Sequence, residues 1–139
     1  SLEDEVNILL NQQSIAQNTL LDQVTPLITA AQIVEYRNII NEVIIDPKLV
    51  ELIAKIVQAT RHNSALYLGA SPRASLAILR SAKANAAIKG RDFVNPEDII
   101  EMAVPVLRHR VILNPEKEME GVTPDELINS IISNIEVPR

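Results

Sequence analysis

The stretch that decides the fold is DPKLVELIAKIVQATR, which covers residues 46–61. Asp46 can accept hydrogen bonds from the free N–H groups of a helix start, and Pro47 loses no hydrogen bond at the first helical position. The apolar residues that follow repeat at the spacing of one helix face: Leu49, Leu52, Ile53, Ile56 and Val57. We therefore predict a strongly amphipathic helix that ends near residues 61–63.

The same start signal, a capping residue followed by proline, opens three further predicted helices. They begin at Ser71-Pro72, Asn95-Pro96 and Thr123-Pro124. The helix from Pro72 should end at Gly90, because glycine readily adopts the left-handed conformation of a C-cap. Acids follow two of the starts, where the helix dipole favours negative charge: Glu97, Asp98, Asp125 and Glu126.

Two more helices are predicted nearer the N-terminus. Residues 2–13 place acids ahead of apolar Val6, Leu9 and Leu10. Thr29 and Gln32 have the form of a capping box, and an apolar stripe follows them: Ile33, Tyr36, Ile40 and Val43. Between these helices, residues 12–25 are polar and poorly periodic, so we interpret them as a connector.

The composition favours an all-α fold. Apolar residues make up 47% of the 139 residues but aromatics only 2%, so the core must be aliphatic. Three glycines are too few for a chain of many tight β turns. The β-branched residues 111–113 could add one short strand, with residues 93–94 or 43–45 as its candidate partners.

Charge and composition also exclude several classes of function. A net charge of −5 argues against a nucleic-acid-binding module, which normally carries a basic face. No apolar run approaches the length of a membrane-spanning helix, and acids at residues 3–5 argue against a signal peptide. The absence of cysteine excludes disulfides and fits a cytoplasmic protein.

The segment Gly69-Ala70-Ser71-Pro72-Arg73-Ala74 places an arginine in the first turn of a helix. The helix dipole makes this end positive, so a cation there does not serve stability. Free N–H groups and a guanidinium at one point can bind an anion such as phosphate. From the residues alone, a solvated arginine or one paired with a surface carboxylate stays open as the alternative.

This segment resembles the lid motif of MoxR-family AAA+ ATPases, which are relatives of magnesium chelatase subunits. Further blocks resemble that family in the same order along residues 45–115: Ala59-Thr60-Arg61, Gly90-Arg91-Asp92, Val94-Asn95-Pro96-Glu97-Asp98 and Val106-Leu107-Arg108-His109-Arg110. The resemblance implies a helical AAA+ lid over residues 29–139. It also implies that residues 1–28 are a handover segment from a missing ATPase core, plus the connector.

The resemblance implies roles for three residues. Arg73 would be the sensor-2 residue, which approaches the γ-phosphate of ATP, and Ser71, Pro72 and Arg73 would form the nucleotide-contacting turn. ATP and Mg²⁺ would be used by the full-length protein and would not be held tightly by this chain. Whether Arg73 acts on the nucleotide of its own subunit or of a neighbour stays open.

The resemblance also implies partners: the protein's own core domain, a homo-oligomeric ring that is hexameric by family habit, and a client protein to be remodelled. The 139 residues contain no Gly-x-x-x-x-Gly-Lys-Ser/Thr phosphate loop, so we expect this chain alone not to hydrolyse ATP. The rival hypothesis is a free-standing helical adaptor that binds a partner through an apolar stripe. Such an adaptor would be indifferent to Arg73.

Other candidate residues favour ordinary structural roles. His62 and His109 lack the spacing of a metal site, so no metal ligands are predicted. The basic group Arg108-His109-Arg110 suits a helix end, and Tyr36 and Tyr67 are too isolated to stack bases. The carboxylates of Asp4, Glu5, Glu97 and Asp98 are interpreted as helix-start acids and not as catalytic pairs.

Overall fold

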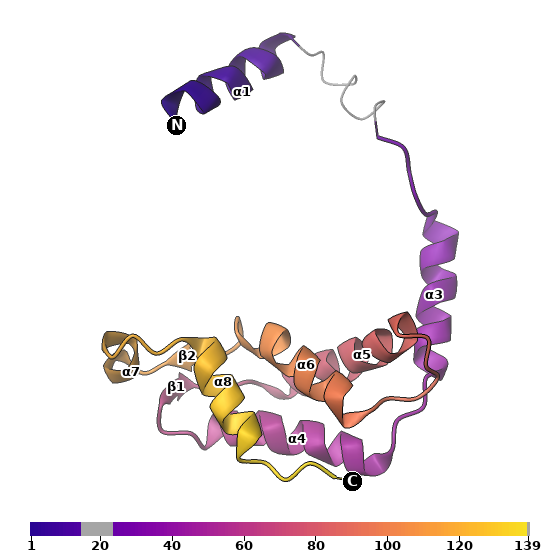
Figure 1. Cartoon of the computed structure of the whole chain (residues 1–139), viewed down its shortest axis with the longest axis vertical. Coiled ribbons are helices and arrows are strands. Elements are labelled where there is room, and N and C mark those ends of the chain that lie inside the picture. Colours follow the sequence, from indigo (N-terminus) through magenta and orange to yellow (C-terminus); the bar gives the residue numbers. More distant parts are fainter. Residues whose placement is uncertain (15–23, 139) are drawn as a thin grey trace. The chain divides into compact units, whose positions relative to one another are not determined.

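A computed structural model describes residues 1–14 and 24–138, and it confirms the all-α fold with one small β pairing. Most of the predicted connector lies outside these residues. The elements in chain order are α1 (Leu2–Ser14), α3 (Ala30–Glu42), α4 (Pro47–Arg61), β1 (Leu66–Leu68), α5 (Pro72–Ile88), α6 (Pro96–Leu107), β2 (Ile112–Leu113), α7 (Pro115–Met119) and α8 (Pro124–Ser133) (Figure 1).

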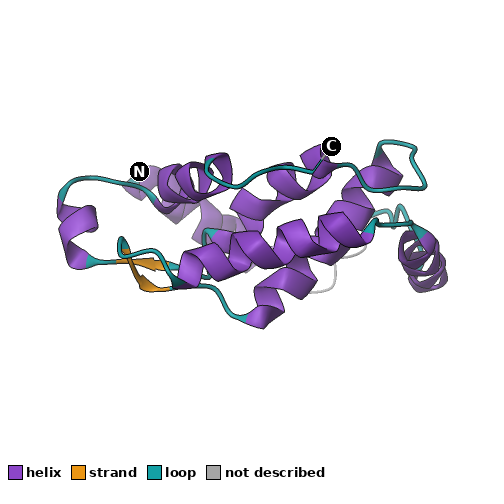
Figure 2. Cartoon of the chain, turned by 90° about the horizontal axis from the view of Figure 1, so that it is seen from below, coloured by secondary structure: helices purple, strands orange, loops and turns teal. Residues whose placement is uncertain are grey.

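The chain divides into two compact units, Ser1–Glu35 and Tyr36–Arg139. In the second unit, α4, α5, α6 and α8 enclose an aliphatic core, and the strand pair lies at one end beside α7 (Figures 1 and 2). Its largest fully buried apolar side chains come from all four helices: Leu52, Ile56, Val57, Ile78, Ile99, Leu107 and Ile128. The face of α5 is built mainly from alanines, since Ala74, Ala82 and Ala86 are 0% exposed.

The predicted helix starts are confirmed, and short-range side-chain hydrogen bonds explain those at Asp46 and Thr29. The Asp46 carboxylate accepts from the Lys48 N–H at 2.7 Å. In the capping box before α3, the Thr29 N–H donates to Gln32 Oε1 at 2.8 Å and the Gln32 N–H donates to Thr29 Oγ1 at 3.2 Å. Gly90 ends α5 with a φ of 73°, a backbone conformation that side chains rarely permit.

The predicted strand partner was wrong. Strand β2 pairs antiparallel with β1, which joins α4 to α5, and Leu66 lies opposite Leu113. The two segments proposed as partners instead bond to each other, because the Ile44 N–H donates to Asp92 O at 2.8 Å and the Val94 N–H donates to Ile44 O at 2.9 Å. Strand β1 has only three residues, and two of them are exposed. Its sequence, Leu-Tyr-Leu, does not alternate between apolar and polar residues, so periodicity could not predict a strand there.

In the described residues, the apolar side chains of α1 and most of those of α3 are exposed. Ile40 is half-buried, and Val43, which follows the end of α3, is 4% exposed and belongs to the core. No residue of α3 is buried, and Ile33 and Tyr36 are 40% and 45% exposed. In α1 the exposed fractions of Val6, Leu9 and Leu10 are 45%, 69% and 58%. Both helices therefore depend on local hydrogen bonds more than on packing.

We predict that residues 2–10 are the least stably folded helical segment of the isolated chain. A helix of this length is marginal in water when its apolar side is not covered. Amide hydrogen exchange at low protein concentration should show much lower opening energies there than in α5. Equal protection of α1 and α5 in a chain shown to be monomeric would contradict this prediction.

Candidate functional site

The turn that precedes α5 packs directly on the end of α4. At Gly69, an added Cβ would lie 2.6 Å from both the Arg61 Cα and the Thr60 carbonyl oxygen. Backbone atoms cannot move aside as the end of a flexible side chain can, so a side chain at position 69 would force the turn and the helix apart. The last turn of α4 and the turn before α5 therefore form one closely packed junction.

A buried hydroxyl joins the same two segments. The Thr60 side chain is only 1% exposed, and its Oγ1 donates a hydrogen bond to Val57 O at 2.7 Å. The same oxygen accepts a hydrogen bond from the Ala70 N–H at 2.9 Å. Ala70 is completely buried, so this backbone donor would have no water to replace the hydroxyl. Thr60 thus satisfies a buried N–H in the turn that leads to Arg73.

Helix α5 begins one residue later with Ser71, Pro72 and Arg73 together at its N-terminus. Ser71 is the N-cap, with φ −79° and ψ 166°, but its side chain makes no capping hydrogen bond. The Arg73 side chain is exposed, and it forms no hydrogen bond or ion pair with any residue that the structure describes. A pairing of Arg73 with a surface carboxylate is therefore not found in this part of the chain.

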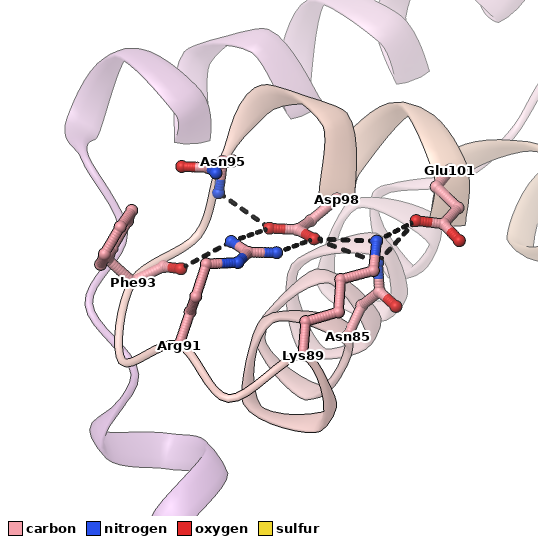
Figure 3. A network of polar contacts seen from close by, with 7 residues as sticks. All are labelled: Asn85, Lys89, Arg91, Phe93, Asn95, Asp98 and Glu101. Carbon is pink, nitrogen blue, oxygen red and sulfur yellow. Dashed lines mark hydrogen bonds and ion pairs between the residues drawn. The ribbon is translucent and has the colours of Figure 1, made fainter.

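A buried ion pair holds the opposite end of α5 (Figure 3). The Asp98 carboxylate is 0% exposed and receives two hydrogen bonds from the Arg91 guanidinium, at 2.7 and 2.8 Å. The Asn95 N–H donates to the same carboxylate at 2.9 Å and completes the start of α6. Asp98 is thus a helix-start acid, as predicted, and also the anchor of a network that the sequence analysis missed.

The network extends from Asp98 to the surface through α5 and α6. Asn85 on α5 donates to Asp98 at 3.1 Å and to Glu101 at 2.9 Å, and Lys89 forms an ion pair with Glu101 (Figure 3). The pairing of Arg91 with a carboxylate seven residues ahead was not evident from spacing. The one feature of the sequence that could have indicated this ion pair is that Arg91 and Asp98 lie in two adjacent blocks that resemble the family.

These contacts determine the protonation of Asp98. The hydrogen bonds from the Arg91 guanidinium lower the pKa of the Asp98 carboxyl, and desolvation by burial opposes this effect without overcoming it. Hydrogen bonds from Lys89 and Asn85 likewise lower the pKa of Glu101. Both carboxylates stay ionised near neutral pH, so the network is a structural clamp and not a proton-transfer site.

The remaining predicted candidates are exposed or bound to structural partners. His62 contacts Gln58 O at 3.0 Å at the end of α4, and Arg108 forms an ion pair of 2.7 Å with Asp125 on α8. Among the described residues, no three His, Asp or Glu side chains lie together as metal ligands would. No helix in the described ranges is long and apolar enough to cross a membrane.

The chain belongs to the AAA lid domain family, in agreement with its helical fold and its motifs. The sequence model of this family matches residues 58–131. The chain's relatives narrow this class to the lid of a MoxR-family AAA+ ATPase. It is 36% identical to chaperone MoxR1 of Mycobacterium tuberculosis over 66% of this chain and 26% of that protein. It is 32% identical to the uncharacterized protein YeaC of Bacillus subtilis over 99% of this chain and 42% of that protein.

A solved structure has the same fold. The crystal structure of a Cytophaga hutchinsonii protein proposed to be an ATPase superposes with a TM-score of 0.77 at 33% identity, over 100% of this chain and 44% of that one. The chain therefore spans less than half the length of the relatives it matches. The predicted family and helical lid fold are confirmed.

We predict that Asp98→Ala lowers the free energy of unfolding by about 3 kcal/mol. This is the lower end of the range for removing one partner of a buried ion pair, because Arg91 keeps partial access to water. Urea unfolding at pH 7 measures the effect, and Glu97→Ala is the matched control, since Glu97 is an exposed acid of the same helix turn. The control should change stability by less than about 0.5 kcal/mol.

The pH dependence of this difference follows from the lowered pKa of Asp98. An unfolded Asp has a pKa near 3.9, so the stabilisation by ionised Asp98 is complete well above that pH. It is lost as the pH falls through the lower pKa of the folded state. A gap between wild type and Asp98→Ala that stays constant from pH 7 to pH 2 would show that the charge on Asp98 does not matter.

Proposed function

We propose that this chain is the lid through which a MoxR-like ATPase senses its nucleotide, with Arg73 as the sensor-2 residue. The observation that carries the proposal is an exposed guanidinium without a partner among the described residues, at a helix start that is packed rigidly on α4. The exposed Arg80 of the same helix also has no partner among the described residues, so it is the place of Arg73 at the helix start that distinguishes it. Arg73 is left available for a ligand that this chain does not contain.

The chemistry of the site suits a phosphoryl group. The N-terminus of α5 carries the positive end of the helix dipole, and Ser71 leaves the helix start without a side-chain cap. A guanidinium can grip two phosphate oxygens with parallel hydrogen bonds. In a phosphoryl transfer, this charge would stabilise the negative oxygens of the transferring group and would couple the state of the nucleotide to the position of the lid.

The rest of the machinery belongs, in this proposal, to the part of the protein outside this chain. ATP would be bound and Mg²⁺ held by a core domain with a phosphate loop, to which residues 1–28 lead. Membership of the AAA lid domain family supports assembly into a homo-oligomeric ring, and the relative named chaperone MoxR1 supports a role in remodelling client proteins. A helical adaptor without nucleotide chemistry is disfavoured, because an adaptor does not require Arg73 or its rigid turn.

We predict that Arg73→Ala in the full-length protein lowers kcat for ATP hydrolysis by about 10²- to 10³-fold, the effect of removing one preorganised charge donor. ATP affinity should fall less. Arg73→Lys should restore only part of the rate, because one ammonium group cannot reproduce the two-pronged contact. Steady-state ATPase assays measure these changes, and the isolated 139-residue chain should show no turnover.

The matched control is Arg80→Ala. Arg80 is another exposed arginine of α5, two helical turns further along, and it has no partner among the described residues. Its removal changes the charge of the same helix by the same amount, so it should leave kcat within about twofold of wild type, as expected for a group outside the charge-stabilising site. Equal losses of kcat for Arg73→Ala and Arg80→Ala would mean that only the surface charge of α5 matters. A fully active Arg73→Ala variant would refute the sensor role of Arg73.

A further inference from the structure

Arg73 has no side-chain partner among the described residues, so its position is determined by the backbone that carries it. That backbone is the short segment from Gly69 to the first turn of α5. Ala74 is 0% exposed and its N–H donates to Ser71 O at 2.8 Å, so the first turn is formed and anchored from Ser71 onward. The first turn of α5 is connected to α4 by the two residues that precede Ser71: Gly69 packs on the α4 backbone, and the Ala70 N–H bonds to Thr60.

The Thr60 hydroxyl is placed to orient this segment. Its one hydrogen is used by Val57 O, so the lone pairs of Oγ1 are left to accept from the Ala70 N–H. The bond spans ten residues of sequence and links α4 to the residue next to the N-cap of α5. Within the described residues, Thr60 and Asp98 are the two buried polar or charged side chains, and Asp98 already serves the far end of α5.

We infer that Thr60 is a positioning residue for Arg73: its hydroxyl holds the Ala70 N–H and so sets where the first turn of α5 presents the guanidinium. This inference rests on the proposed function of Arg73. Valine in place of Thr60 has nearly the same shape but no acceptor, so it leaves the Ala70 N–H buried and unsatisfied. The turn would then shift to bring that donor to water or to another acceptor.

The test uses the full-length protein and four variants: Thr60→Val, Thr60→Ser, Arg73→Ala and the double variant Thr60→Val/Arg73→Ala. A displacement of a catalytic group by about 1 Å can cost about 10²-fold in rate. We expect Thr60→Val to lower kcat by at least about tenfold, with a smaller change in KM, and Thr60→Ser to restore most of the rate because it keeps the acceptor.

The decisive result is the double variant. If Thr60 acts through Arg73, Thr60→Val should cause little further loss of kcat once Arg73 is alanine, because residues that act together are not additive. Ile128→Val is the matched control for lost stability, since Ile128 is a buried core residue on α8. It should lower the melting temperature without lowering kcat. Amide exchange at Ala70 should accelerate in Thr60→Val and not in Ile128→Val.

Three outcomes separate the hypotheses. Equal losses of kcat from Thr60→Val with and without Arg73, or an unchanged kcat with faster exchange at Ala70, would overturn the positioning role while leaving Arg73 as sensor. A normal kcat in Arg73→Ala would refute the proposed function itself. If Thr60→Val does not fold, Thr60→Ala replaces it, because alanine also removes the acceptor of the Ala70 N–H but places no methyl group against that donor, and the same comparison applies.

Discussion

The alanine face of α5 determines how closely the other helices can approach it. A buried alanine removes apolar surface from water but projects little beyond the backbone, so Ala74, Ala82 and Ala86 let neighbouring helices come near the α5 axis. Ile78 is the one large side chain among the four fully buried residues of this face. A larger residue at any of these alanines would separate the helices, and the aliphatic core from α4, α6 and α8 would lose its closest partner.

Alanine packing alone permits sliding, because small side chains offer few interlocking shapes. Two polar contacts restrict it at the ends of α5. At the C-terminal end, Arg91 grips the buried Asp98 and ties the loop after α5 to the start of α6. At the N-terminal end, the Thr60 hydroxyl and the missing side chain of Gly69 hold the preceding turn against α4. Both contacts involve groups that are costly to leave unsatisfied, so they specify a single position of the helix.

The contacts at the N-terminal end of α5 fix the backbone that carries Arg73, although the Arg73 side chain has no partner among the described residues. In the proposed role of Arg73, the rigid part of the site is backbone, and the guanidinium would meet a ligand that other parts of the protein supply. A lid that acts in this way would need such a separation, because its charged group would have to meet the nucleotide and then move away from it with the lid. The relatives, which are at least twice as long as this chain, provide the context in which that movement would occur.

The sequence by itself determined the features whose causes lie within one helical turn. The starts at Asp46, Asn95 and Thr123 and the end at Gly90 depend on hydrogen bonds and backbone angles of neighbouring residues, so local residue types predict them. The core stripe of α4 was equally evident from its spacing. The family-like motif of residues 69–74 also indicated Arg73 as a candidate nucleotide contact.

Only the tertiary structure decided the contacts between segments that are distant along the chain. The pairing of β1 with β2, the burial of Asp98, the bond from Ala70 to Thr60 and the exposed stripe of α3 all depend on where whole helices come to rest. Periodicity shows which face of a helix is apolar but not what covers it, and a capping acid has the same spacing whether it is solvated or buried. The physical reason is that burial and partner choice are set by the packing of the complete chain.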